Sequence, residues 1–166
     1  IARITGWEKK KVVVRQMPMG AAFGKREDLC AQHHAALATI ALGGRPVKIT
    51  LSRQESFACT TKRHPFSMSY QVAARRDGTL LGLKANIVAD TGAYASWAPN
   101  ILRKAVVHGA GAYAIDNISI DGRAVYTNNG YCGAFRGFGA PQVHFAVESL
   151  LDELADQLGM DPLVLR

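Results

Sequence analysis

A glycine-rich turn between residues 20 and 27 carries the first chemistry that the sequence suggests. It reads GAAFGKRE and stands between a β-branched run and a helical pattern. A helix start leaves backbone N–H groups without partners, and glycine lets a ligand come close to the chain, so such a turn can hold an anion or an oxo group. Only three residues separate Gly20 from Gly24, which excludes a P-loop. The alternative is an ordinary strand-to-helix turn.

A second glycine-rich segment spans residues 133–142 and reads GAFRGFGAPQ. Phe135 and Phe138 stand in a loop just before a helix, with glycines on both sides. Exposed rings beside small residues suit a flat ligand that stacks on one face. The competing interpretation is that these rings fill the core beneath the loop.

The histidines and cysteines do not form a recognisable metal or disulfide pattern. His33 and His34 lie within a helical pattern without a further ligand one turn away, so they predict no metal site. Cys30, Cys59 and Cys132 are widely spaced and contain no CxxC pair. We therefore expect no structural zinc and no disulfide scaffold, and we expect a reducing, cytoplasmic environment.

The composition is that of a folded protein with an uneven distribution of charge. Of the 166 residues, 48% are hydrophobic and 20% are charged, and the net charge is +7. Residues 143–166 carry a charge of −4, so the preceding residues carry +11. The basic pairs are scattered and lack interleaved aromatic residues, so we expect no nucleic-acid partner. No run approaches the roughly 18 apolar residues of a membrane span.

Periodic apolar residues predict the elements that must hold the two turns. Alternation over 66–75 and 80–89, around Asp77-Gly78, is typical of a β-hairpin. An apolar stripe over 143–158 predicts a long amphipathic helix. The remaining expected elements are a helix over 27–42, a helical turn or loop near 100–109, and strands at 11–15, 47–51 and 118–126. The predicted fold class is α+β, a mixed sheet with two principal helices packed against it.

The end of the chain bears on domain organisation. Asp161-Pro162 begins a helix that is cut short at Arg166. A domain seldom stops one turn into a helix. We therefore expect residues 1–166 to be one domain that is truncated at both ends.

Taken together with their separation, the motifs resemble the molybdenum-binding large subunit of the molybdenum hydroxylases, the xanthine dehydrogenase and aldehyde oxidase family. Residues 19–27 are similar to the family's MGGGFGGKE segment, and residues 134–142 are nearly its AFRGFGGPQ. Residues 44–47 and 63–66 match its GRPV and RHPF. These matches keep their order from about residue 3 to the end, so the resemblance covers essentially the whole chain.

The resemblance implies a function. In this family a molybdenum ion held by molybdopterin hydroxylates an N-heterocycle or aldehyde carbon with oxygen from water, and electrons leave through iron–sulfur clusters and usually FAD. A glutamate acts as the base, and no segment of this sequence resembles its motif, so we expect no catalytic residue and no direct metal ligand here. The implied cofactor-binding residues are Phe23, Gly24, Ala134, Phe135 and Arg136. The implied substrate-binding residues are Glu27, Lys104 and Phe138.

The same resemblance implies partners and leaves one alternative. The expected partners are the rest of the large subunit, iron–sulfur and flavin (FAD) subunits or domains, and a small-molecule substrate. Residues 1–166 alone are expected to be inactive and to lack the molybdenum–molybdopterin cofactor. Lys104 stands where purine-oxidising members carry arginine, and Lys25 replaces a glycine. Lysine does not reproduce arginine's planar fork, so xanthine itself is in doubt as the substrate. The alternative is a non-catalytic anion- or nucleic-acid-binding module with a degenerate site.

Overall fold

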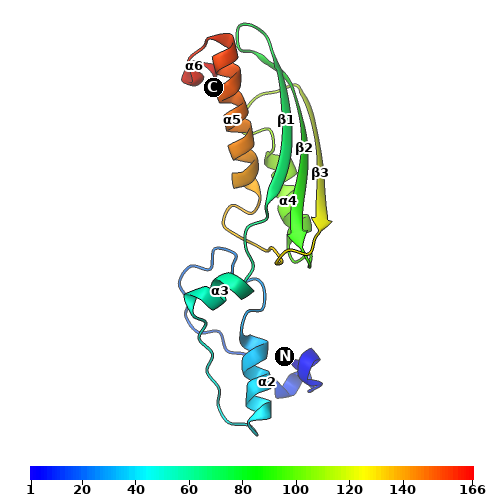
Figure 1. Ribbon diagram of the computed structural model, residues 1–166, viewed down its shortest axis with the longest axis vertical. Coiled ribbons are helices and arrows are strands. Elements are labelled where there is room, and N and C mark those ends of the chain that lie inside the picture. The colour runs from blue at the N-terminus through cyan, green and yellow to red at the C-terminus, as the bar shows by residue number, and fades with distance from the viewer.

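The computed structural model describes all residues from Ile1 to Arg166 and has an elongated shape (Figure 1). A sheet with helices α4 and α5 forms one end, and helices α2 and α3 and the N-terminus lie at the other end. The helices are α1 (Ala2–Thr5), α2 (Gln32–Ala41), α3 (Arg53–Cys59), α4 (Ala98–His108), α5 (Ala140–Leu158) and α6 (Pro162–Leu165), with a 3-10 turn η1 at Lys9–Lys11. The strands are β1 (Phe66–Ala74), β2 (Leu80–Gly92) and β3 (Asn117–Tyr126). No helix is both long and apolar enough to cross a membrane.

The three strands form a mixed sheet in the order β1-β2-β3. β1 and β2 are antiparallel, with Met68 opposite Ile87, whereas β2 and β3 are parallel and are joined through α4. The predicted hairpin is confirmed, since Gly78 has a φ of +90° and the N–H of Thr79 donates to the Asp77 carboxylate at 3.0 Å. The left-handed conformation explains why glycine follows aspartate in this turn.

The core lies where α4 and α5 cover one face of the sheet. Alternate residues of β2 point into it, as the twofold period of a strand requires. The buried side chains are Leu83, Ala85, Ile87 and Ala89 of β2, Ala98, Ile101 and Ala105 of α4, and Val143, Val147, Leu151 and Ala155 of α5. The long helix and the α+β fold class are confirmed, although the fully buried stripe of α5 includes Leu151 and Ala155 in place of the expected Leu150, Leu154 and Leu158, which are half-buried.

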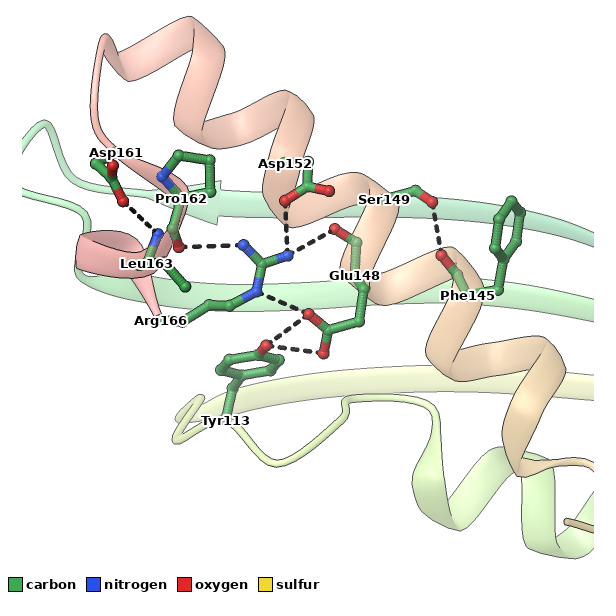
Figure 2. A network of polar contacts seen from close by, with 9 residues as sticks. All are labelled: Tyr113, Phe145, Glu148, Ser149, Asp152, Asp161, Pro162, Leu163 and Arg166. Carbon is green, nitrogen blue, oxygen red and sulfur yellow. Dashed lines mark hydrogen bonds and ion pairs between the residues drawn. The ribbon is translucent and has the colours of Figure 1, made fainter.

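The C-terminal turn folds back onto α5 through a polar network (Figure 2). The guanidinium of Arg166 bonds Glu148 and Asp152, each at 2.8 Å, and the Tyr113 hydroxyl donates to the Glu148 carboxylate at 2.8 Å. Burial raises the pKa of Glu148, but the hydrogen bonds from Arg166 and Tyr113 outweigh it, so that the pKa is lowered overall. The expected helix start is confirmed, because the Asp161 carboxylate accepts from the N–H of Leu163 at 2.7 Å. The network joins α5, α6 and the loop before β3.

Several expectations for the N-terminal third are wrong. The segments 11–15 and 47–51 form no strand, and the side chains of Val13 and Val14 are 77% and 79% exposed. The helix expected over 27–42 begins only at Gln32, and α4 takes the place expected for it against the sheet. Residues 1–59 contain no buried side chain. A β-branched run forms a strand only where another strand pairs with it, and these segments have no such neighbour within the chain.

Asp90 ties the end of β2 to the segment after β3. Its carboxylate accepts from the hydroxyl of Thr127 at 2.6 Å, from the side-chain amide of Asn129 at 2.6 Å and from the N–H of Gly92 at 2.7 Å. The bonds from Thr127, Gly92 and Asn129 lower the pKa of Asp90. All three favour the charged form, so Asp90 serves here as a structural anion.

We expect Asp90→Asn to lower the thermal unfolding temperature at neutral pH, because the amide loses the charge and has one acceptor oxygen fewer. The pKa of Asp90 is depressed in the folded state. Its charge therefore stabilises the fold at pH values above the unfolded-state pKa of about 3.9. This stabilisation is lost as the pH falls through the lower pKa of the folded state. Thermal unfolding from pH 7 to pH 3 checks this, with the exposed Asp116→Asn as control. A difference in unfolding temperature between wild type and Asp90→Asn that stays constant over that pH range contradicts this prediction.

Candidate active site

The two glycine-rich turns, far apart in the sequence, lie against each other. A Cβ atom on Gly24 would lie 2.8 Å from the carbonyl carbon of Ala134 and 3.0 Å from its Cβ, so only glycine permits this approach. The guanidinium of Arg136 lies over the ring of Phe23, with its carbon 5.2 Å from the ring centroid. The structure therefore brings four of the five predicted cofactor-binding residues into direct contact, and Phe135 stands between Ala134 and Arg136.

The two turns share an unusual backbone conformation. Phe23 and Phe138 have φ angles of +50° and +53°, and each is followed by a glycine at +88° or +100°. A bulky residue in the left-handed region is strained and persists only where its surroundings hold it there. Besides these two phenylalanines, the one other non-glycine residue with a positive φ is Ser96, at +42°. Such strain concentrates at functional sites.

The contact between the turns leaves backbone donors unused. The N–H groups of Ala134, Phe135 and Arg136 donate no hydrogen bond within the chain, although Ala134 is only 3% exposed. The N–H groups of Phe23 and Gly24 are likewise without an acceptor. Of these five residues only Ala134 is buried. A buried N–H is nearly always paired, so the unpaired N–H of Ala134 fits a bound group that presents oxygen or sulfur acceptors, as the expected cofactor does. The N–H groups of the other four residues lie beside it on exposed or half-buried residues.

Lys25 stands where the resembled family has glycine, and its side chain does not fill the space between the two turns. Its ammonium donates to the hydroxyl of Ser56 on α3 at 2.9 Å, so the side chain is held by α3. The contact between Gly24 and Ala134 is therefore compatible with lysine at this position.

Arg63 holds the second turn from outside. Its Nη2 donates to the carbonyl of Arg136 at 2.8 Å, and its guanidinium carbon lies 4.5 Å from the ring centroid of Phe135. Its Nη1 donates to the side-chain oxygen of Gln142 at 3.5 Å, and the Gln142 amide donates to the carbonyl of His64 at 3.2 Å. Local sequence indicates only a strand-entry turn at Arg63, and the match to RHPF is the one signal that singles it out.

Two buried polar atoms beside the turn have no hydrogen-bond partner, the hydroxyl of Thr61 and Nε2 of His64. His64 is 2% exposed, and burial lowers its pKa although the charge of Asp90 acts in the opposite direction. The imidazole is therefore neutral near pH 7. His64 therefore adds no positive charge beneath the second turn.

Lys104 and Phe138 lie together, and Glu27 does not join them. With Asn100, Arg103 and Val107, they line a hollow of about 330 Å³ beside α4. Glu27 is exposed in its own turn, where its N–H donates to the carbonyl of Gly24 at 3.1 Å, and its carboxylate makes no contact with that hollow. Its role in substrate binding stays a prediction.

Close backbone packing places Phe138 beside α4. A Cβ atom on Gly139 would lie 2.5 Å from the carbonyl oxygen of Ile101 and 3.3 Å from Ala105. The ring of Phe138 meets Trp97 edge to face, with centroids 6.2 Å apart. The sequence did not single out Trp97, and no local pattern marks it.

We expect Gly139→Ala to destabilise the fold more than Gly44→Ala. Both glycines have positive φ angles, +100° and +90°, but a Cβ on Gly44 meets nothing within 4 Å. The backbone strain of about 1 kcal/mol is thus common to both, and the collision with α4 adds roughly 1–3 kcal/mol at Gly139 alone. Chemical denaturation of the two variants measures the difference, and equal losses contradict the packing argument.

We expect Arg63→Ala to speed amide hydrogen exchange over residues 134–139 and to cost about 1–3 kcal/mol of stability, because one charged hydrogen bond and one stacking contact are lost. Arg63→Lys should restore little of this, since an ammonium lacks the planar fork. The matched control is Arg53→Ala, because Arg53 also lies over a ring, that of Phe57 at 5.2 Å, but on α3. Unchanged exchange in Arg63→Ala would contradict the assigned role.

Comparison with known proteins agrees with this geometry. The chain is 46% identical over 166 residues to a probable xanthine dehydrogenase subunit of Bacillus subtilis, of which it covers 22%. It is 41% identical over 166 residues to the nicotinate dehydrogenase large molybdopterin subunit of Eubacterium barkeri, of which it covers 39%. It superposes on the crystal structure of the aldehyde oxidoreductase from Desulfovibrio desulfuricans with a TM-score of 0.81 and 34% identity, over 86% of this chain and 16% of that one. The family model described as the molybdopterin cofactor-binding domain matches residues 1–166, and the chain therefore belongs to that family.

Proposed function

We propose that residues 1–166 form one wall of the active site of a molybdenum hydroxylase that oxidises an N-heterocycle or an aldehyde. The observation that carries the proposal is the contact of the two Phe–Gly turns, which leaves a set of N–H donors unused beside Ala134. The family match over the whole chain supports it. Relatives named as a xanthine dehydrogenase subunit, a nicotinate dehydrogenase subunit and an aldehyde oxidoreductase support the reaction class.

The roles of individual residues follow from their place. The free N–H groups of Phe23, Gly24, Ala134, Phe135 and Arg136 would hold acceptor atoms of the cofactor by hydrogen bonds. When bound, the molybdenum cofactor supplies the redox chemistry by which an oxygen from water is transferred to carbon. The ring of Phe138 would stack on a flat substrate, Lys104 would donate to a substrate acceptor, and Glu27 would orient the substrate from the first turn.

The proposed enzyme needs parts that this chain does not supply. The chain spans 22% and 39% of two curated relatives, so the catalytic glutamate and the iron–sulfur and flavin centres are proposed to lie elsewhere in the assembly. Residues 1–166 would then serve to position cofactor and substrate and would be inactive alone. We propose a cytoplasmic location, as for other proteins whose cysteines are widely spaced and unpaired.

The test uses the complete enzyme, purified from cells supplied with molybdate. We expect stoichiometric molybdenum and dye-linked oxidation of an N-heterocycle or an aldehyde. Phe138→Ala should raise KM for a flat substrate about fivefold, as expected for roughly 1 kcal/mol of lost stacking, with molybdenum content unchanged. Phe145→Ala, which removes a ring that is 76% exposed on α5, is the control.

Two results would contradict the proposal. Complete enzyme without molybdenum and without turnover, together with salt-dependent binding of nucleic acid, would favour the non-catalytic alternative. Kinetic constants that are unchanged in Phe138→Ala would remove that ring from the substrate site.

A further inference from the structure

A second hollow, of about 510 Å³, lies between α3 and the two glycine-rich turns and shares no residue with the hollow beside α4. Figure 1 shows α3 between the sheet and α2, so this hollow lies where the N-terminal third meets the rest of the chain. Of its nine lining residues none is acidic. Three are cations and three carry hydroxyl groups, namely Lys25, Arg53 and Lys62, and Ser52, Ser56 and Thr61.

No carboxylate of the chain pairs with these three cations. The ammonium of Lys25 makes one bond, to the hydroxyl of Ser56 at 2.9 Å, and the guanidinium of Arg53 makes no ion pair. Glu55, the acidic residue of α3, accepts from the N–H of Ser52 at 2.7 Å in the helix cap and does not line the hollow. Like charges that share a hollow repel one another, so the lining favours a negatively charged occupant.

The ring of Phe57 brings two of the cations together. The guanidinium carbon of Arg53 lies 5.2 Å from the ring centroid, and Nζ of Lys62 lies 5.9 Å from it. The Lys62 ammonium also donates to the carbonyls of Ser56 and Thr60, so it supplies charge while its donors are used by the protein. The N–H groups of Arg53 remain free. Phe57 therefore serves to hold cations, and the hollow does not require a flat ligand.

The remaining free polar groups of the lining are donors. The hydroxyl of Thr61 has no partner although the residue is only 4% exposed, and buried polar groups are nearly always bonded. The Ser56 hydroxyl accepts from Lys25, and its own O–H has no acceptor in the chain. Asp28 lies near Thr61 but does not line the hollow, and its carboxylate accepts from the Ser96 hydroxyl at 2.8 Å. The unpaired Thr61 hydroxyl is thus a second indication of a bound acceptor, independent of the charge.

We propose that this hollow binds a tetrahedral oxyanion of the phosphate type, either free phosphate or the phosphate group of a small organic molecule. Its donors come from three segments, with Lys25 on the first turn, Arg53 on α3 and Thr61 before β1. A phosphate group presents an oxygen to each of them, whereas a carboxylate has only two oxygens to share, and the guanidinium fork matches phosphate geometry. This ligand takes no part in the proposed oxidation, so the site goes beyond the proposed function.

The bound anion would support the first turn. Residues 1–59 contain no buried side chain, so little apolar packing holds this part of the chain. A phosphate group bonded to both Lys25 and Arg53 would tie the first turn to α3. Because a ligand that binds only the folded state stabilises it, phosphate should slow amide hydrogen exchange over residues 20–31 and 52–60 and leave β1 unchanged.

The first experiment titrates anions into the complete enzyme by isothermal titration calorimetry, at constant ionic strength and at about pH 8, where phosphate is mainly a dianion. We expect phosphate and sulfate to bind at least about tenfold more tightly than nitrate, which has a single charge. Tighter binding of phenyl phosphate than of phosphate would support the site with an organic phosphate as occupant, and equal binding would support it with free phosphate. Nitrate that binds as tightly as phosphate overturns the proposal.

Charge variants assign the binding to its residues. Lys25→Met and Arg53→Met should each weaken phosphate binding about tenfold, and Thr61→Val should weaken it about fivefold, because each removes a donor. Lys25→Arg should keep most of the affinity. Lys84→Met, which removes an exposed cation from β2, is the matched control and should change nothing. Phosphate affinity that survives Lys25→Met and Arg53→Met together overturns the proposal.

Hydrogen exchange of the wild-type enzyme tests the same site without any substitution. Exchange over residues 20–31 and 52–60 that phosphate leaves unchanged overturns the proposal even where a variant fails to fold. Enzyme that contains molybdenum and turns over, but does not prefer phosphate to nitrate, overturns this site and leaves the proposed function intact. Phosphate binding through Lys25 in enzyme that holds no molybdenum supports the site while the proposed function fails.

Discussion

Close packing at three glycines is the constraint on which the rest of the site depends. Gly24 lies against Ala134, Gly133 lies against Thr61 and Asp28, and Gly139 lies against the carbonyl of Ile101. At each point a Cβ atom would come within 2.8 Å of a neighbouring atom. Because the glycines place no side chain between these segments, the two turns, the helix α4 and the segment before β1 hold one another at fixed distances.

The strained phenylalanines adjoin this packing. Phe23 and Phe138, which occupy the left-handed region, each stand directly before one of these closely packed glycines, Gly24 and Gly139. Arg63 then reinforces the second turn from outside by its bonds to Arg136 and Gln142. The N–H groups of Phe23, Gly24, Ala134, Phe135 and Arg136 have no acceptor within the chain.

Two surfaces with different chemistry result from one loop. Its N-terminal half, around Ala134 and Arg136, presents backbone N–H donors without an acceptor in the chain. Its C-terminal half places Phe138 against α4, where Arg103 and Lys104 supply charge and the ring supplies a flat surface. Under the proposed function, cofactor recognition would therefore rest on the main chain and substrate recognition on side chains.

Local patterns were sufficient to predict the hairpin and the long helix, because the Asp77-Gly78 turn and the apolar stripe of α5 each involve residues that are close together in the sequence. They were misleading for residues 11–15 and 47–51, where strand formation depends on a neighbouring strand that local residues do not specify. The sequence by itself determined the α+β class, the two turns and their family resemblance. Only the tertiary structure decided that Gly24 meets Ala134, that Arg63 and Trp97 support the second turn, and that Lys104 joins Phe138 without Glu27. These contacts join residues far apart in the chain, so no local sequence pattern specifies them.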